Sequence, residues 1–115
     1  MDKKTTGDRG EALALEYLSN KGYTLLEKNY RYKKAEIDLI VCKEDLLVFV
    51  EVKARSSTGY GFPEEAVDEK KAAMIMEAAD HYIYETGWDK PIRFDIVSIL
   101  LQPRVSIRHF EDAFW

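Results

Sequence analysis

The sequence has little cysteine and no long apolar run. Cys42 is the one cysteine among 115 residues, so no disulfide can form within the chain, which favours a reducing compartment. No stretch approaches the roughly 18 apolar residues of a transmembrane helix, and the start Met1-Asp2-Lys3-Lys4 is not followed by the apolar segment of a secretory signal. These absences predict a cytoplasmic protein with no membrane span.

Several signals of well-known chemistry are also absent. The sequence has no glycine-rich phosphate loop, and His81 and His109 have no neighbours at metal-ligand spacing, so we interpret both as structural or surface residues. Cys42 has no histidine partner and reads as a small apolar side chain. There is no repeat, low-complexity tract or linker, and 46% of residues are hydrophobic and 33% charged. This composition predicts a single globular domain spanning residues 1–115.

The charge balance is acidic overall but uneven along the chain. The formal net charge is −4, which argues against a protein that coats nucleic acid by bulk electrostatics. The run from Lys28 to Lys34 nevertheless holds four basic residues, two tyrosines and no acid. It can be a solvated strand edge, since lysines protect exposed edges. The alternative is a rim that contacts phosphates.

Hydrophobic periodicity and turn residues predict two helices and five strands. Thr5 or Thr6 is the expected N-cap of the first helix and Pro63 the first residue of the second, while Gly22 and Gly87 follow their ends. The predicted helices span 5–20 and 63–86, and the predicted strands span 23–32, 35–42, 46–54, 92–101 and 105–110. The fourth strand is apolar on both faces and is therefore expected to be central. This order, α-β-β-β-α-β-β, predicts an α/β fold in which helices flank a small mixed sheet.

Two of these strands carry acids that the pairing register brings together. If the hairpin loop between them has an even length, position i pairs with position 89 − i. Asp38 then lies opposite Glu51, and Glu36 opposite Lys53. Like charges in that position are destabilising unless a cation lies between them, and carboxylate oxygens suit Mg²⁺ or Mn²⁺. The alternative is a solvated sheet face that carries these charges at its surface.

Strict alternation along the first of these strands defines its two predicted faces. One face would hold Glu36, Asp38 and Ile40, and the other Ile37, Leu39 and Val41.

The helices add two further charges in apolar surroundings. Glu11 lies at the end of a stripe that continues through Ala14, Leu15 and Leu18. Lys71 lies on the apolar stripe of the second helix. Either side chain alone could extend to solvent. Because inward-facing charges are rarely left unpaired, a polar pocket shared with the strand charges is the simpler interpretation.

Five segments carry a more specific resemblance that covers nearly the whole chain. They are Gly7-Asp8-Arg9-Gly10-Glu11, Glu36-Ile37-Asp38-Leu39-Ile40, Phe49-Val50-Glu51-Val52-Lys53-Ala54-Arg55, Ala66-Val67 with Lys71, and Arg93-Phe94-Asp95-Ile96-Val97. The chain resembles the YraN family of small bacterial proteins. That family is similar to Holliday-junction resolvases and to the restriction-endonuclease-like PD-(D/E)xK nucleases. One departure is visible, because Ala35 stands where the family usually has glycine.

The resemblance implies a restriction-endonuclease-like fold and a catalytic set. Glu11 matches the helix glutamate, Asp38 the metal aspartate, and Glu51 with Lys53 the Glu-x-Lys pair. Lys71 matches a lysine often found on the following helix.

The leading hypothesis is therefore a magnesium- or manganese-dependent endonuclease that hydrolyses DNA, including branched or junction DNA. Asp38, Glu51 and the Val52 carbonyl would hold the metal. The residues expected to contact neighbouring phosphates are Lys28, Arg31, Lys33, Lys34 and Arg55.

Two alternative functions and one oligomeric state remain to be considered from the sequence. The chain could be a nucleic-acid-binding module of the same fold without turnover. It could also be a protein-interaction module that docks a partner on the aromatic tail from Phe110 to Trp115, although such terminal aromatics usually cap a core. A homodimer is an expectation by analogy with resolvases, which cut two strands symmetrically.

Overall fold

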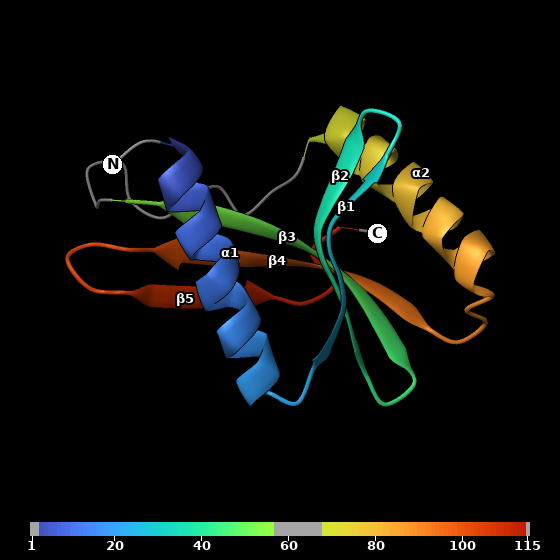
Figure 1. Cartoon of the computed structure of the whole chain (residues 1–115), viewed down its shortest axis with the longest axis horizontal. Coiled ribbons are helices and arrows are strands. Elements are labelled where there is room, and N and C mark those ends of the chain that lie inside the picture. The colour runs from blue at the N-terminus through green and yellow to red at the C-terminus, as the bar shows by residue number, and fades with distance from the viewer. Residues whose placement is uncertain (1–2, 57–67, 115) are drawn as a thin grey trace.

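The computed structural model describes residues 3–56 and 68–114 of the chain. Its elements are α1 (Lys3–Asn20), β1 (Thr24–Tyr32), β2 (Ala35–Lys43), β3 (Leu46–Arg55), α2 (Glu69–Thr86), β4 (Ile92–Leu100) and β5 (Ser106–Phe110). Figure 1 shows this order along the chain. The predicted succession α-β-β-β-α-β-β is confirmed.

The strands form one mixed sheet in the order β1-β2-β3-β4-β5. Neighbouring strands are antiparallel except β3 and β4, which are parallel. A parallel pair needs a long crossover connection, and α2 lies within the connection here. The predicted central position of the fourth strand is confirmed, since β4 lies between β3 and β5 and is buried from Phe94 to Leu100.

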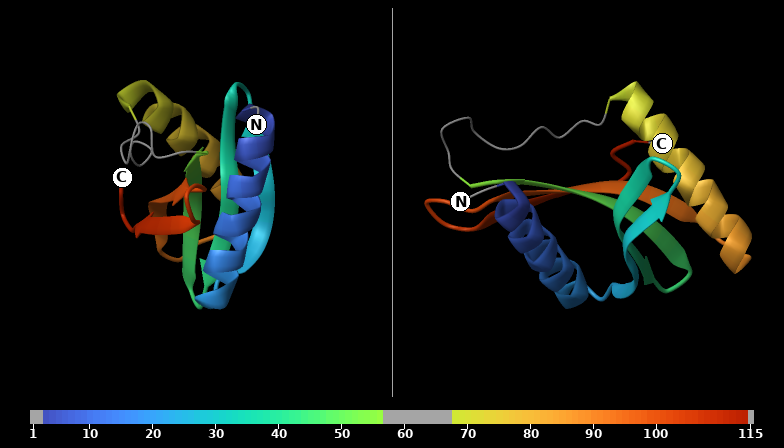
Figure 2. Two further views of the ribbon diagram at one scale, coloured as in Figure 1. Left: turned by 90° about the vertical axis from the view of Figure 1, so that its left-hand side faces the viewer. Right: turned by 45° about the horizontal axis from the view of Figure 1, so that its top comes forward.

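The two helices pack on opposite faces of the sheet. Figures 1 and 2 show α1 crossing one face over β3 and β4, and α2 lying on the other face. Ala14 and Leu18 of α1 share an apolar cluster with Val48, Val50 and Val97 of the sheet. A second cluster joins α2 to the opposite face, and it includes Ile75, Ala78, Tyr82, Ile40, Phe49 and Phe94. The architecture is compatible with a restriction-endonuclease-like fold, as predicted.

The predicted N-cap of α1 is wrong, whereas its end is confirmed. The helix begins at Lys3, so Thr6 lies inside it with only 8% of its surface exposed. Thr6 therefore does not occupy the non-helical N-cap position. At the other end, Gly22 has φ 97° and its N–H donates to the Ser19 carbonyl. This left-handed conformation favours glycine and turns the chain toward β1.

The start of α2 also differs from the prediction. The helix begins at Glu69, and the extended residue Asp68 is its N-cap, with a side chain that accepts a 2.8 Å hydrogen bond from the Lys71 N–H. A capping carboxylate satisfies one of the unpaired N–H groups of the first turn. Pro63, the residue expected to open this helix, lies outside the described residues. The predicted stop at Gly87 is confirmed by its left-handed φ of 71°.

The predicted hairpin register is confirmed along the ladder that joins β2 and β3. Pairs from Lys43–Leu46 to Leu39–Val50 all follow the rule that the two numbers sum to 89. The ladder ends at Leu39–Val50, so Asp38 and Glu51 are the first positions beyond it. The predicted pairing of Glu36 with Lys53 does not form, because β2 turns away from β3 at this point (Figure 1). The separation opens the sheet beside the two acids.

Strict alternation fails at the same place in β2. Ile37 packs in the α2-side cluster with Ile40, whereas Leu39 packs in the α1-side cluster. The predicted grouping of Ile37 with Leu39 and Val41 is therefore wrong. Opposite Asp38, Asn29 has φ 52°, and the β1–β2 ladder keeps one register from Lys28–Leu39 to Tyr30–Ile37. The register shift of this ladder lies between Leu25 and Glu27. A left-handed residue in one strand changes the local twist of both.

Close contact between α1 and β3 requires glycine at position 10. A Cβ atom there would lie 2.6 Å from the Cβ of Ala54. We expect Gly10→Ala to destabilise the fold by about 1–3 kcal/mol through overpacking. Gly7→Ala is the matched control, because nothing lies within 4 Å of its Cβ position, and alanine there should stabilise the helix by about 0.5–1 kcal/mol. Urea unfolding measures both, and shifts of the same sign would contradict this packing.

Candidate functional site

Carboxylates from two elements gather where β2 leaves β3. Glu11 of α1 and Glu36 and Asp38 of β2 are half-buried, and each offers an oxygen within 4.8 Å of the others. A cavity of about 330 Å³ adjoins this cluster. The cavity is lined by Lys34, Ala35, Glu36, Asp38, Glu51, Lys71, Met74 and Ile75. Charged residues that the sequence places on apolar faces of helices and strands thus lie close together in this region.

Asp38 is fixed by the backbone of the neighbouring strand. The Val52 N–H donates a 2.7 Å hydrogen bond to Asp38 Oδ2. Because Val52 lies beyond the end of the β2–β3 ladder, the Asp38 carboxylate replaces a backbone carbonyl of β2 as the acceptor for this N–H. Burial, and then the charges of Glu51 and Glu11, raise the pKa of Asp38 to about 8. The Val52 N–H and the Lys71 ammonium oppose this rise only in part. The Asp38 carboxyl therefore binds a proton more readily than an ordinary aspartate, first because it is buried and then because two acids lie near it.

Glu51 is buried and paired with Lys71. Its exposed fraction is 6%, and Lys71 Nζ donates a 2.9 Å hydrogen bond to its Oε1. Burial lowers the pKa of Lys71, but the hydrogen bond and charge of Glu51 outweigh that effect and the pKa is raised. The lysine of α2 consequently stays charged above the cavity. Lys71 was predicted to lie on the apolar stripe of this helix; Ile75 and Ala78 of that stripe are buried, whereas Lys71 itself is exposed and reaches the buried Glu51 with its ammonium group.

Asn29 belongs to this site but was not predicted from the sequence. Its Nδ2 donates to Glu11 Oε1 at 3.0 Å and to Glu36 Oε1 at 3.2 Å. The amide therefore bridges a helix carboxylate and a strand carboxylate. The sequence signal that could have found it was an asparagine inside a predicted strand, within the basic run. Asparagine adopts the left-handed conformation more readily than most non-glycine residues, so it indicates a backbone irregularity there.

The predicted phosphate-contacting residues occupy different environments. Arg31 forms a 3.0 Å ion pair with Glu36, and Lys33 a 3.1 Å ion pair with Glu77. Lys34 lines the acidic cavity, and Lys28 is exposed on β1. Arg55 is half-buried at the end of β3. These cations thus differ in burial and in their partners, and Lys34 is the one of them among the described residues that line the acidic cavity.

Lys53 lies further along β3 than Glu51 and is half-buried beside Ser98 of β4. It is not among the described residues that line the acidic cavity.

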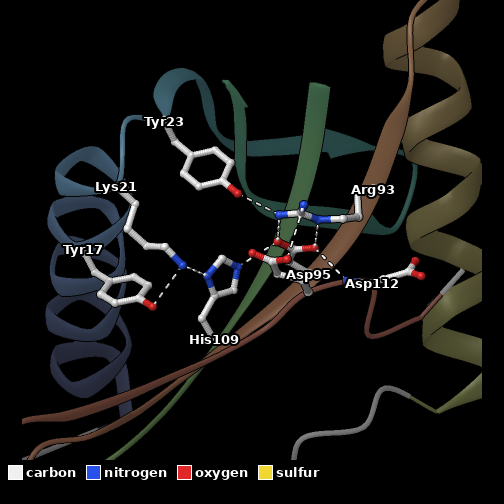
Figure 3. A network of polar contacts seen from close by, with 8 residues as sticks. Tyr17, Lys21, Tyr23, Arg93, Asp95, His109 and Asp112 are labelled. Atoms are coloured by element: carbon white, nitrogen blue, oxygen red, sulfur yellow. Dashed lines mark hydrogen bonds and ion pairs between the residues drawn. The ribbon is translucent and has the colours of Figure 1, made fainter. Parts of the chain in front are cut away.

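A separate polar network lies on the α1 face of the sheet (Figure 3). Asp95 of β4 is fully buried and accepts hydrogen bonds from Arg93 Nε and Nη2, from the Asp112 N–H and from the ring of His109. Burial raises the pKa of Asp95, but the bonds from His109 and Arg93 outweigh that effect and hold it below its ordinary value. Arg93 Nη2 also donates to the Tyr23 hydroxyl at 2.7 Å. The network ties β4, β5 and the chain after α1 together.

The outer part of this network reaches the end of α1. Lys21 Nζ lies 3.0 Å from His109 Nδ1 and 3.3 Å from the Tyr17 hydroxyl. The histidine side chain is only 3% exposed, which confirms the structural interpretation of His109. His81 is a helix-surface residue whose ring stacks on Tyr32 and lies 3.3 Å from Glu85.

The aromatic tail packs into the core. Phe114 is 5% exposed, and its ring centroid lies 5.3 Å from that of Phe94. The capping interpretation is confirmed for this residue, which leaves its side chain little surface for a partner. Trp115 lies outside the described residues. None of the helices in the described parts of the chain has the length and hydropathy to cross a membrane.

Fold and site together define a class of protein: a small α/β protein with a mixed five-stranded sheet that opens beside a group of half-buried acids. The chain belongs to the family described as "Uncharacterised protein family UPF0102", whose model matches residues 10–99. The predicted family is thereby confirmed.

Relatives of similar length support the same assignment. A UPF0102 protein of Flavobacterium psychrophilum is 44% identical over 95% of this chain and 92% of its own. One from Clostridioides difficile is 45% identical over 99% of this chain and 100% of its own. One from Persephonella marina is 43% identical over 94% and 91%.

Proposed function

We propose that this protein is a metal-dependent nuclease that hydrolyses phosphodiester bonds in DNA. The observation that carries the proposal is the position of Asp38. Its carboxylate lies near those of Glu11 and Glu36, and Glu51 lines the same cavity. Burial, together with the charges of Glu51 and Glu11, raises the pKa of Asp38 to about 8. A structural protein gains no stability from such an arrangement.

The side chains present fit a hard divalent cation. Glu11, Glu36 and Asp38 offer carboxylate oxygens close to one another, the ligand type that Mg²⁺ and Mn²⁺ prefer. The proposal keeps Glu51 and the Val52 carbonyl, which adjoin Asp38, as further candidate ligands. When bound, the cation would supply Lewis acidity at a phosphoryl oxygen and a more acidic water.

The remaining residues have supporting tasks in this proposal. The Val52 N–H orients the Asp38 carboxylate, and Lys71 holds the Glu51 carboxylate in place. Lys53 would stabilise negative charge that develops on the phosphate or orient the attacking water. The DNA backbone would contact the exposed side chains of Lys28, Arg31, Lys33 and Lys34 and the half-buried side chain of Arg55. Symmetric cutting of two strands would need a homodimer, which light scattering tests.

A cleavage assay tests the activity. Purified protein is incubated with Mn²⁺ and with single-stranded, flapped and four-way-junction DNA. We expect cleavage by the wild type and at least about 100-fold less with Asp38→Asn. Asp80→Asn, which changes an exposed acid of α2, is the matched control and should cleave normally.

The Glu51–Lys71 ion pair favours one alternative, because it already neutralises one of the acids. Under this alternative the chain is a nucleic-acid-binding module without turnover. Wild type that binds DNA but shows no more cleavage than Asp38→Asn on any substrate would contradict the nuclease and support the module.

The bridging amide of Asn29 gives a prediction that does not depend on turnover. Asn29→Gly keeps the backbone at φ 52° accessible but removes the donor shared by Glu11 and Glu36. Loss of an orienting hydrogen bond typically costs about 10–100-fold in metal affinity. Calorimetric titration with Mn²⁺ should show weakening in that range. Asn20→Gly at the exposed end of α1 is the control, and equal affinities of the two variants would contradict the role of Asn29.

A further inference from the structure

A second cavity lies beside the acidic one. Its volume is about 260 Å³, and it lies between the β1–β2 turn and α2, which run close together in Figures 1 and 2. It is lined by Tyr32, Lys33, Lys34, Ala35, Met74 and Glu77. Lys34, Ala35 and Met74 line both cavities. The two cavities are therefore neighbouring parts of one depression, the first acidic and the second apolar.

The second cavity has an apolar interior and a charged rim. Ala35 and Met74 contribute aliphatic surface, and the ring of Tyr32 is held flat against His81, with centroids 4.2 Å apart and planes at 23°. At the rim, Lys33 is held by its ion pair with Glu77. A volume of about 260 Å³ exceeds the roughly 150 Å³ in which a protein core accommodates a benzene ring. The cavity thus suits a flat aromatic heterocycle attached to an anion.

Lys34 stands between the two cavities. Its side chain is exposed, and it forms no hydrogen bond or ion pair with any residue in the ranges 6–56 and 68–114. By contrast, Lys33 and Lys71 are both engaged by glutamates. An ammonium without a protein partner at this junction is available to an anionic group that passes from one cavity to the other.

We propose that the apolar cavity binds one unpaired nucleobase of the substrate, while Lys34 contacts the phosphate that links it to the nucleotide in the acidic cavity. This inference rests on the proposed nuclease function and narrows its substrate. A base inside a duplex is stacked and paired, and it would have to leave the helix to enter the cavity. The substrate class is therefore nucleic acid with an unpaired nucleotide next to the scissile phosphate, such as a single strand, a flap or a loop.

Binding measurements test this without any need for cleavage. The Asp38→Asn protein is titrated, by fluorescence polarisation at low ionic strength, against an oligothymidylate and an abasic oligomer of equal length and charge. We expect the oligothymidylate to bind at least about tenfold more tightly, the effect of a single stacked base. The further substitution Tyr32→Ala in the Asp38→Asn protein should reduce the affinity for the oligothymidylate to that for the abasic oligomer. It should leave the affinity for the abasic oligomer unchanged. Tyr32→Phe in the same protein should retain the difference in affinity between the two oligomers.

Two further variants separate the base cavity from general electrostatics. Lys34→Ala should weaken the binding of both oligomers by the same factor, because a contact with a phosphate does not depend on the base. Tyr84→Ala, which removes an 83% exposed tyrosine from α2, should change neither.

Three results would overturn the proposal. They are equal affinity of the Asp38→Asn protein for the two oligomers, an equal loss for both on Tyr32→Ala, and no binding of either. Absence of cleavage by the wild type with Mn²⁺ would contradict the nuclease function instead, and the comparison of the two oligomers would still stand.

Discussion

In the absence of divalent cations, the free energy of unfolding should fall as the pH rises from about 4 to about 8, and Asp38→Asn should remove this fall. The ordinary aspartate pKa of 3.8 applies to the unfolded chain, and the folded protein raises it to about 8. A raised pKa means that the folded state binds the proton more tightly, so the contribution is present at low pH and is lost as the carboxyl ionises in the fold. Burial and the charges of Glu51 and Glu11 are the cause.

The expected loss is a few kcal/mol, since each tenfold change in proton affinity corresponds to about 1.4 kcal/mol. Urea unfolding in EDTA at pH 5 and pH 8 measures it as the difference between wild type and Asp38→Asn. Asp80→Asn, an exposed acid of α2, is the control and should follow the wild type. The same pH dependence in wild type and Asp38→Asn would show that the charge of Asp38 is already compensated within the fold.

Divalent cations should restore the stability that the wild type loses at pH 8, and they should have much less effect on Asp38→Asn. A cation that binds only the folded state stabilises it in proportion to RT ln(1 + [L]/Kd), and it favours the ionised Asp38. Addition of Mn²⁺ at pH 8 should therefore raise the urea midpoint of the wild type, and the midpoint of Asp38→Asn should change much less. This result would connect the electrostatic strain of the site to its proposed metal.

Asp95→Ala should strongly destabilise the fold, because Asp95 is the centre of the polar network on the α1 face of the sheet. Asp95 is fully buried and neutralises Arg93, whose side chain is 19% exposed. Its removal leaves the guanidinium, the His109 ring and the Asp112 N–H without their common acceptor. Loss of one partner from a buried ion pair costs about 3–5 kcal/mol, which is a large part of the stability of a small domain.

Urea unfolding at pH 7 measures this loss, with Asp89→Ala at an exposed position as the control. Without Asp95 the charge of Arg93 keeps, among the described residues, only the longer 3.7 Å ion pair with the exposed Glu111. The double variant Asp95→Ala/Arg93→Ala should therefore lose less stability than the sum of the two single variants. Strict additivity, or a loss below about 1 kcal/mol for Asp95→Ala, would show that the network contributes little.

The network and the candidate site are both connected to α1. Tyr23 and Lys21, just after α1, contact Arg93 and His109, while Gly10, near the middle of the helix, packs closely on Ala54. These contacts position α1 on the sheet, and Glu11 directly follows Gly10. Weakening of either contact should reduce the precision with which Glu11 meets Asn29 and Asp38.

The order of the elements and the register of β2 on β3 were predictable from the sequence. Alternating apolar residues and a short turn determine which residues of a hairpin face each other, so the rule that pairs i with 89 − i holds from Leu39 to Lys43. The helix stops at Gly22 and Gly87 were equally local, since a left-handed residue after a helix favours glycine. The off-pattern charges Glu11, Asp38, Glu51, Lys53 and Lys71 also predicted a shared polar pocket, although Lys53 is not among the described residues that line the acidic cavity.

Only the tertiary structure decided which acids meet and what surrounds them. Beyond the end of the ladder β2 separates from β3. Glu36 is therefore not paired with Lys53, its predicted partner, and lies close to Glu11 and Asp38 instead. The bridging amide of Asn29 and the second cavity beside Tyr32 arise from the same twist and from the packing of α2 against the hairpin. Periodicity describes a straight strand with two constant faces, whereas twist and the meeting of distant elements depend on the packing of the whole chain.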